Sequence, residues 1–336
     1  MTTLVTGAAG FLGSHVARLL IERGESVRLL VRAASNRRAL STLGAEICEG
    51  DLRDPQSVAK AFEGVRRVYH VAADYRLWAR NPQEIYDSNV GGTLNLLEAA
   101  ARAGCERFVY TSTVATIAVH RPGAGREGLP DETIETQLAE MIGHYKRSKW
   151  LAEQEAVKAA KQGVPVVIVN PTAPVGPGDA KPTPTGKLIV DFLNGRMPAF
   201  VDTGLNLVGV EDCAAGHLLA AEKGRIGERY ILGARNMTLQ EILCTLARIA
   251  GMAAPRFRLP HAVAYAAGCV DTVVARIFGR EPKIPLEGVR MSRHRMFVDA
   301  SRAVRELGFA PAPPEQALER AVRWYQANGY APSLAA

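Results

Sequence analysis

A tyrosine and a lysine four residues apart, Tyr145 and Lys149, have a spacing in this 336-residue chain that suggests proton chemistry. They lie in a strongly helical stretch, so their side chains share one helix face. A phenol is a poor base at pH 7, because bringing its pKa to neutrality takes about three units, roughly 4 kcal/mol. An adjacent ammonium is a perturbation of the right kind. Tyr145 is therefore the candidate proton-transfer group and Lys149 its activator, although such pairs also occur by chance.

Two hydroxyl side chains, Ser112 and Thr113, end the strand-like run that precedes this helix. A substrate carbonyl oxygen beside Tyr145 would need a second hydrogen-bond donor, and a hydroxyl can supply it. Thr113 is the candidate for that role, with Ser112 second. Capping of the strand end is the structural alternative for either residue.

A glycine-rich turn near the start of the chain is typical of a dinucleotide site. Gly7, Gly10 and Gly13 follow a strand-like run and open a helix-period segment, which is the context that such a motif requires. The glycines allow a tight turn and let backbone N–H groups, including those of Phe11 and Leu12, approach a pyrophosphate. A glycine turn with no ligand is the alternative.

The residue that ends the second strand distinguishes the two nicotinamide cofactors. An acidic residue there would bind the adenosine ribose, whereas an arginine accommodates a 2′-phosphate. This chain has Arg32, followed closely by Arg37 and Arg38. NADP(H) is therefore favoured and NAD(H) stays open, as does an Arg32 that merely covers a strand end.

An aspartate, Asp51, follows the third strand-like run and precedes Leu52. This position lies at the carboxyl edge of the expected sheet, where ligands of open α/β folds bind. Asp51 could accept a hydrogen bond from an adenine amino group. It could instead cap the next helix, although Asp54, directly before a proline, is the better candidate for that cap.

Strand-length apolar runs alternate with helix-period segments along the first half of the chain. This alternation predicts an α/β fold, a Rossmann-type doubly wound parallel sheet with helices on both faces. Five prolines fall between residues 171 and 184 and interrupt any helix there. We place a boundary at this segment, with a nucleotide-binding domain over 1–172. Residues 173–336 form a smaller mixed α/β substrate lobe that returns one or two elements to the sheet.

Composition and charge limit the classes of partner. The formal charge is +7, but the arginines are scattered and form no aromatic-interleaved stripe, which argues against nucleic acid and favours phosphate-bearing ligands. The five cysteines include no CxxC pair, so neither a metal site nor a disulfide framework is expected. No signal peptide is evident at the N-terminus, and we expect a cytoplasmic protein.

Several weak motifs occur in a fixed order, and together they are specific. They are TGAAGFLG from Thr6, GDL from Gly50, HVAA from His70, the segment Ser88–Thr93, YTST from Tyr110, Tyr145-x-x-x-Lys149 and Asn170-Pro171. In this order the chain resembles the extended short-chain dehydrogenase/reductases over nearly its whole length. Thr113 stands where many members carry serine, which keeps the hydroxyl and adds a methyl group.

The resemblance assigns roles to the matched positions. It implies a catalytic set of Thr113, Tyr145 and Lys149 and a pyrophosphate loop of Gly7, Gly10 and Gly13. It also implies a cofactor-binding set that comprises Asp51, Leu52, Ala72, Ala73, Asn89, Pro171, Thr172 and Ala173. The stretch Asn170–Ala173 would line the nicotinamide carboxamide.

Within the family, the chain looks like the hopanoid-associated sugar epimerases, with dihydroflavonol reductase-like proteins as near neighbours. An epimerase would oxidise and re-reduce a carbinol carbon with retained cofactor. Alternatively, an NADPH-dependent ketone reductase would use the same residues in one direction. A nucleotide-sensing protein without catalysis is a third reading. We expect a homodimer acting on a sugar, nucleotide-sugar, lipid-linked glycan or ketone.

Two regions bear on the substrate and on a membrane. Asp74, Tyr75 and Trp78 follow Ala72 and Ala73, the expected wall beside the cofactor, and Lys181 belongs to the proline-rich crossing. These four residues are therefore candidates for substrate contact.

The nearly apolar segment 261–278 is too short to span a bilayer. It is flanked by basic residues, namely Arg256, Arg258, Arg276, Arg280 and Lys283. Burial against the lobe or a subunit is favoured over peripheral membrane contact for this segment.

Overall fold

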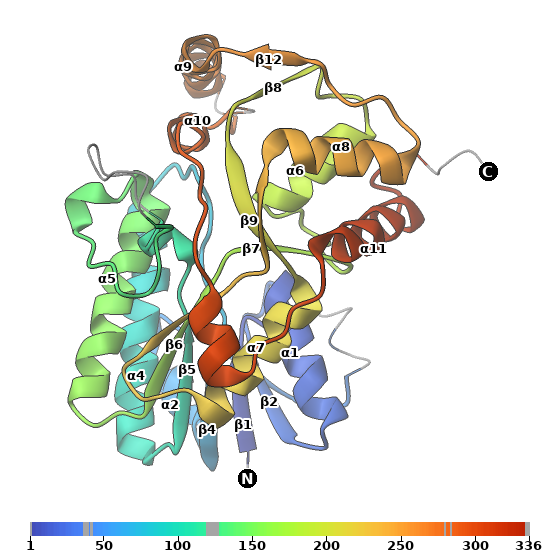
Figure 1. The fold of residues 1–336 in the computed structure, drawn as a ribbon. Helices are drawn as coiled ribbons and strands as arrows, with labels where there is room; N and C mark the ends of the chain where they lie inside the picture. Colours follow the sequence, from blue (N-terminus) through green and yellow to red (C-terminus); the bar gives the residue numbers. More distant parts are fainter. Residues whose placement is uncertain are drawn as a thin grey trace.

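The computed structural model describes residues 2–35, 40, 43–118, 128–278, 280–282 and 284–332. Within these ranges, seven strands form one parallel sheet in the spatial order β3-β2-β1-β4-β5-β6-β10 (Figure 1). They are β1 (Thr2–Thr6), β2 (Ser26–Val31), β3 (Glu46–Glu49), β4 (Val65–His70), β5 (Arg107–Thr111), β6 (Val166–Pro171) and β10 (Arg229–Leu232). The order reverses between β1 and β4, which opens a ligand crevice at their carboxyl ends. The predicted Rossmann-type fold is confirmed.

Helices cover both faces of this sheet. One face carries α1 (Phe11–Glu22) and α7 (Val210–Lys223), and the other carries α2 (Pro55–Ala61), α4 (Gly92–Ala103) and α5 (Gly143–Lys161). Successive strand residues alternate between the two cores, as the period of a strand requires. Leu4 packs under α2, α4 and α5, whereas its neighbour Val5 packs under α1 and α7.

The second lobe has its own core and its own small sheets. In its three-stranded sheet, β9 (Gly204–Gly209) pairs in parallel with β7 (Ala173–Val175) and antiparallel with β11 (Arg235–Thr238). Three helices pack around this sheet, namely α6 (Pro184–Leu193), α8 (Leu239–Ala250) and α11 (Pro314–Ala327). At the far end of the lobe, β8 (Ala199–Val201) pairs in parallel with β12 (Phe257–Leu259). The helices α9 (His261–Ile277) and α10 (Leu286–Met291) lie beside them.

The proline-rich crossing predicted between the two parts separates β6 from α6. Pro184 is the first residue of α6, where its missing N–H costs no hydrogen bond, and the Thr183 hydroxyl accepts from the Gly186 N–H at 3.1 Å as the N-cap. After the crossing the chain does not stay in the second lobe. It returns through α7 and then adds β10 to the edge of the large sheet next to β6.

The apolar pattern of residues 84–103 predicts a single helix, but the structure interrupts it. The structure has a short α3 (Gln83–Tyr86), a π-helical turn at Asp87–Gly91 and then α4. A π-helical turn places one extra residue in the helix and re-aims a side chain. Here the turn contains Asn89, which is buried and points toward the segment after β4.

Candidate functional site

The loop between β1 and α1 brings backbone very close to backbone. Gly7 has φ +76°, and a Cβ added to it would lie 2.6 Å from the Ala72 nitrogen. A Cβ on Gly13 would lie 2.2 Å from the Gly7 carbonyl oxygen. Gly10 is the N-cap of α1, and within the described chain no side chain caps this helix. The first N–H groups of α1 therefore have no side-chain acceptor, which suits a phosphate group.

Arg32 and Asp51 follow β2 and β3 at the same edge of the sheet. Asp51 accepts hydrogen bonds from Arg53, with the closest ion-pair contact at 2.6 Å. Arg53 is the main cause of the lowered pKa of Asp51, and the charge of Arg32 contributes to it. Arg37 and Arg38 lie outside the described residues.

The helix cap after β3 belongs to the neighbouring aspartate. Asp54 accepts from the Gln56 and Ser57 N–H groups at the start of α2, at 3.0 and 3.3 Å. Asp51 therefore does not cap this helix and keeps its place at the sheet edge. Leu52 is partly buried and lies beside Gly92 at the start of α4.

The residues that follow β4, Ala72–Asp74, form one wall of the site, and the Asn89 side chain holds this wall in place. The Ala72 N–H donates to the Thr6 hydroxyl at 3.2 Å, and Ala73 is exposed. The Asn89 amide binds the Asp74 backbone twice, accepting from its N–H at 2.7 Å and donating to its carbonyl at 2.9 Å. It also donates to the Ser148 hydroxyl on α5 at 2.9 Å. The Asn89 side chain thus fixes the wall relative to the helix that carries Tyr145.

A buried histidine supports the same wall. The His70 ring lies between the Thr6 hydroxyl at 2.8 Å and the Thr93 hydroxyl at 3.0 Å. Burial lowers the pKa of His70 to about 3, so the ring is neutral at physiological pH. Neutral His70 can link β1, β4 and α4 without placing a charge under the loop.

Tyr145 and Thr113 meet above the end of β5. A hydrogen bond with Thr113 opposes part of the effect of burial, and burial raises the pKa of Tyr145. This direction is the opposite of the one predicted for a catalytic base. The Thr113 hydroxyl also accepts from the Ala115 N–H at 3.2 Å. A hydroxyl has one proton and two lone pairs, so Thr113 can accept from the backbone and still donate.

Lys149 is buried and its hydrogen bonds go to β5. Its ammonium donates to the Tyr110 hydroxyl at 2.9 Å and to the Thr111 carbonyl at 2.8 Å. Burial lowers the pKa of Lys149 to about 7. The spacing of Tyr145 and Lys149 along the chain did not indicate that Lys149 binds a residue of β5. Lys149 therefore ties α5 to the strand that carries Thr113.

Sequence reasoning missed a buried carboxylate, Glu153, one helical turn beyond Lys149. It accepts hydrogen bonds from four side chains, with Oε2 bound by Ser112, by Thr116 at 2.9 Å and by Asn170 at 2.9 Å, and with Oε1 at 3.3 Å from Arg229. Ser112 is thus committed to an internal bond, which leaves Thr113 as the outward hydroxyl. The i, i+4, i+8 spacing from Tyr145 would have placed Glu153 on the same helix face.

The four substrate candidates differ in their surroundings. Tyr75 is 39% exposed, and its charge interactions reach Tyr145 and the buried Asp179. The Asp74 carboxylate is held by Arg76 at 2.6 Å. Trp78 is partly buried, whereas Lys181 is exposed. Of the four candidates, Tyr75 is the one that influences the pKa of Tyr145.

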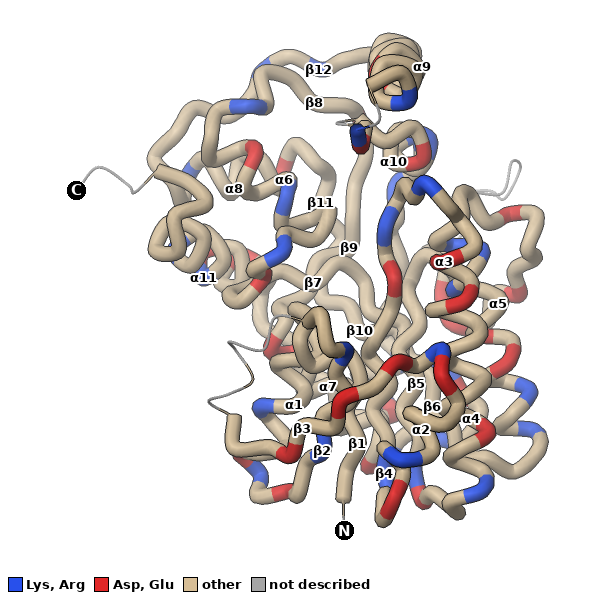
Figure 2. Tube along the Cα trace, turned by 180° about the vertical axis from the view of Figure 1, so that it is seen from behind, with Lys and Arg blue, Asp and Glu red and all other residues tan. Residues whose placement is uncertain are grey.

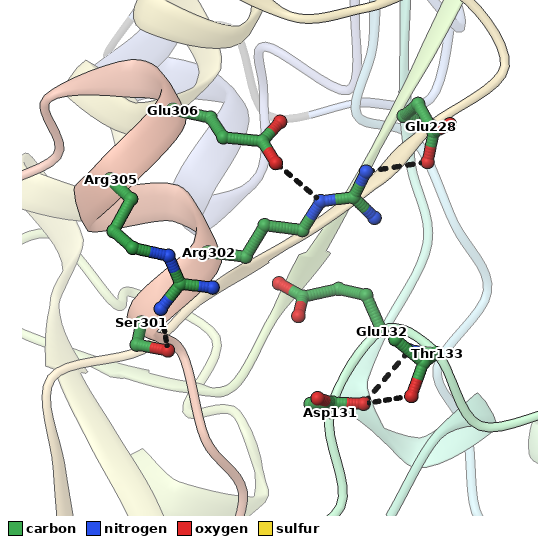
Figure 3. Close-up of a pocket in the computed structure, with 8 residues that line it drawn as sticks. All are labelled: Asp131, Glu132, Thr133, Glu228, Ser301, Arg302, Arg305 and Glu306. Carbon is green, nitrogen blue, oxygen red and sulfur yellow. Dashed lines mark hydrogen bonds and ion pairs between the residues drawn. The ribbon is translucent and has the colours of Figure 1, made fainter.

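A separate hollow of about 440 Å³ lies at the amino end of β10 (Figure 3). Arg302 in this hollow bonds Glu228 at 2.6 Å and Glu306 at 3.2 Å. The Glu132 carboxylate accepts from the Ile231 N–H of β10 at 2.7 Å. These charged groups form ion pairs and hydrogen bonds with neighbouring residues. In addition, ligands of open α/β sheets bind at the opposite, carboxyl edge of the sheet. The hollow reads as structural.

Comparison with known proteins adds to this geometry. Residues 3–233 match the model of the NAD dependent epimerase/dehydratase family. This range begins at the second residue of β1 and ends one residue after β10, so it contains nearly all of the large sheet and the candidate site.

Relatives match the chain almost end to end. A protein of Synechocystis sp., named provisionally as a dihydroflavonol 4-reductase, is 46% identical over 97% of this chain and 95% of its own length. Sterol demethylase protein B of Methylococcus capsulatus is 38% identical, with 98% and 99% covered. The crystal structure of gox2253 superposes with a TM-score of 0.86 at 45% identity, with 98% of this chain and 99% of that chain covered.

Proposed function

Because this chain belongs to the NAD-dependent epimerase/dehydratase family of extended short-chain dehydrogenase/reductases, we propose that it is an NADPH-dependent reductase of a ketone carbon. The observation that carries this proposal is the bonding of Lys149 on α5 to Tyr110 and Thr111 at the carboxyl end of β5, which brings Tyr145 beside Thr113. Two adjacent hydroxyls can bind one ketone oxygen and deliver a proton to it. The 46% identity to the Synechocystis protein supports the same activity.

The glycine loop fits a dinucleotide cofactor. The space that a Cβ on Gly7 or Gly13 would fill is occupied by backbone atoms, as a closely approached pyrophosphate turn requires. We propose that Gly7, Gly10, Phe11, Leu12 and Gly13 hold the pyrophosphate. A nicotinamide cofactor supplies the hydride when it is bound.

Arg32 supports NADP(H) rather than NAD(H). It lies at the end of β2, on the same edge as Asp51, where a 2′-phosphate on the adenosine ribose would meet a positive charge. The rest of the proposed cofactor set comprises Asp51, Leu52, Ala72, Ala73, Asn89, Tyr145, Lys149, Pro171, Thr172 and Ala173.

The chain's own residues account for the proton step. Tyr145 keeps its proton at neutral pH because burial raises its pKa, and it donates that proton to the ketone oxygen. Thr113 donates a hydrogen bond to the same oxygen. Lys149, bonded to Tyr110 and to the Thr111 carbonyl, holds the end of β5 in register with α5.

The epimerase that the sequence placed first needs Tyr145 to begin as a base. The relatives support the reductase better than this epimerase, and they do not extend to hopanoid metabolism. A nucleotide-sensing role would not need the Tyr145–Thr113 pair at all.

For the substrate, we propose an apolar ketone on a fused-ring body. The names of two relatives refer to a dihydroflavonol and to a sterol, which are both fused-ring molecules. The exposed Tyr75 ring near Tyr145 gives such a body a flat aromatic surface.

The test begins with the nucleotide. The purified protein is denatured, the released nucleotide is identified, and NADPH oxidation is followed with a panel of fused-ring ketones. The proposal expects exchangeable NADP(H) and net NADPH loss. Tightly retained oxidised cofactor without net consumption would instead establish the epimerase.

Tyr145→Phe tests the proton donor. We expect turnover to fall by about 10²–10⁴-fold, because a positioned acid is lost, while NADPH binding measured by fluorescence is kept. Tyr265→Phe, at an exposed tyrosine of the second lobe, is the matched control. Normal turnover by Tyr145→Phe would refute the mechanism.

A further inference from the structure

The end of the second lobe exposes a continuous apolar surface on β12 and α9. Phe257, Ile277 and Phe278 expose 75, 72 and 74% of their area. The α9 surface comprises these three residues together with Leu259, Val263, Tyr265, Val270 and Val273, all of which are exposed. On α9 itself, Gly268 and Ala275 are the buried residues. The lobe therefore covers only one side of this helix, and burial of the remainder against a subunit stays a prediction.

Three of the exposed side chains share one face of the helix, whereas Tyr265 lies on another side of it. Val263, Val270 and Ile277 recur every seven residues, which brings them to nearly the same angle around α9. Gly268 lies on the opposite side, where an added Cβ would be 3.4 and 3.5 Å from Val289 and Leu286 at α10. One face of α9 is thus packed on α10, and the other has no partner in the described chain.

The charges around this surface are mainly positive. Residues 256–280 contain four arginines and one acidic residue, Asp271. Asp271 is mostly buried and is bound by Arg280 at 2.6 Å and by the Ile284 N–H at 2.7 Å. Figure 2 shows basic positions on β12 and α9 at the end of the molecule away from the N-terminus. Lys283 lies outside the described residues.

We propose that the α9 surface seats the protein on an anionic lipid bilayer. An apolar helix face buries about 5–10 Å into the boundary between head groups and acyl chains, and arginines beside it bind anionic lipids. Among the residues that the structure describes, no helix is long and apolar enough to cross a membrane. The surface therefore supports peripheral binding, in which Arg256 and Arg276 face the head groups.

The α9 surface is linked to the candidate site through α10. The Glu287 carboxylate on α10 accepts from the His144 N–H at 3.3 Å, directly before Tyr145. A Cβ on Gly288 would lie 3.7 Å from Leu77, in the segment that carries Tyr75. Binding of the α9 surface to a bilayer would thus hold the substrate side of the site near the lipid. This consequence rests on the proposed function, but the proposal of bilayer binding does not.

Vesicle co-sedimentation tests the proposal. The full chain is mixed with vesicles of phosphatidylcholine alone or with added phosphatidylserine, at low and at high salt. We expect binding to the anionic vesicles that weakens as salt rises. Val270→Glu with Ile277→Glu should reduce it at least about tenfold, because charges would enter the apolar face. Arg256→Glu with Arg276→Glu should remove the preference for phosphatidylserine.

The matched control is Ile226→Glu with Val304→Glu, which alters exposed apolar residues outside the α9 surface and should bind like the unchanged chain. Failure of the unchanged chain to bind either vesicle overturns the proposal. Equal binding by the Val270 and Ile277 variant overturns it too. The other possible occupant of the α9 surface is a second copy of the chain, which analytical ultracentrifugation detects. If the unchanged chain forms a homodimer that dissociates in the Val270 and Ile277 variant, and neither binds vesicles, the surface belongs to that dimer interface.

NADPH oxidation without vesicles keeps the two proposals separate. The α9 variants should oxidise NADPH with a water-soluble ketone at the unchanged rate. Vesicle binding without any ketone reduction would refute the proposed function and leave the membrane surface in place.

Discussion

The ammonium of Lys149 lies 2.9 Å from the Tyr110 hydroxyl and 4.5 Å from the centre of the same ring. Tyr110 is fully buried, and burial raises its pKa well above the ordinary range, so it stays a neutral phenol. The hydrogen bonds of the buried Lys149 therefore go to neutral oxygens of β5, and the charge of Glu153 opposes only part of the effect of burial on its pKa. Because of this arrangement, the free energy of unfolding depends on pH.

Stability should rise with pH because of this lysine. The pKa of Lys149 is about 7 in the folded chain against an ordinary value of 10.5. Between these values the unfolded chain holds a proton that the folded chain has released, so the free energy of unfolding increases with pH. Urea denaturation from pH 7 to 9 should show a shallower rise in Lys149→Met. Lys158→Met, an exposed lysine of the same helix, should keep the original slope; equal slopes in all three would contradict the prediction.

Glu153→Gln should impair both packing and turnover. The amide would present N–H groups to donors that now bind a carboxylate, and leaving buried donors unsatisfied costs about 1–3 kcal/mol each. Because Ser112 and Asn170 flank Thr113, we expect kcat to fall more than NADPH affinity. Glu155→Gln on the same helix is the control. A variant as stable and active as the unchanged chain would show that the cluster does not position Thr113.

Gly13→Ala should weaken nucleotide binding. Its Cβ would lie 2.2 Å from the Gly7 carbonyl oxygen, so the loop or α1 must shift. We expect NADPH affinity, measured by fluorescence titration, to fall at least about tenfold. Gly91→Ala is the matched control, because φ is −58° there and an added Cβ meets no described atom within 4 Å. Unchanged affinity in Gly13→Ala would place the nucleotide elsewhere.

Arg32→Ala should separate the two cofactors. Losing a charged hydrogen bond to a 2′-phosphate costs about 1.5–3 kcal/mol, which is roughly 10–100-fold in affinity. The KM for NADPH should rise by this factor, while the KM for NADH should hardly change. Arg102→Ala, an exposed arginine of α4, should alter neither. An equal effect on both cofactors would remove Arg32 from the phosphate site.

Local sequence patterns predicted the fold well, because alternating apolar periods determine which faces must be buried. The helical pattern over 145–161 and the strand-like runs 206–210 and 228–232 predict α5, β9 and β10 to within two residues. Side-chain contacts between different elements were harder to predict from the sequence. The bond from Lys149 to Tyr110 crosses from a helix to a strand, and spacing along the chain carries no information about it. The exposure of α9 was missed because its apolar residues surround the helix, so no polar face marks the solvent side.

The late return of β10 has a consequence for biosynthesis. During translation β6 emerges with one edge unpaired, and its neighbour β10 follows only after β7, β8, β9 and α7 have been made. An open parallel edge of this kind is prone to wrong pairing. The nascent nucleotide-binding half therefore cannot close before the ribosome has finished a large part of the second lobe. A chaperone that shields β6 in that interval would protect the step at which the sheet is most exposed.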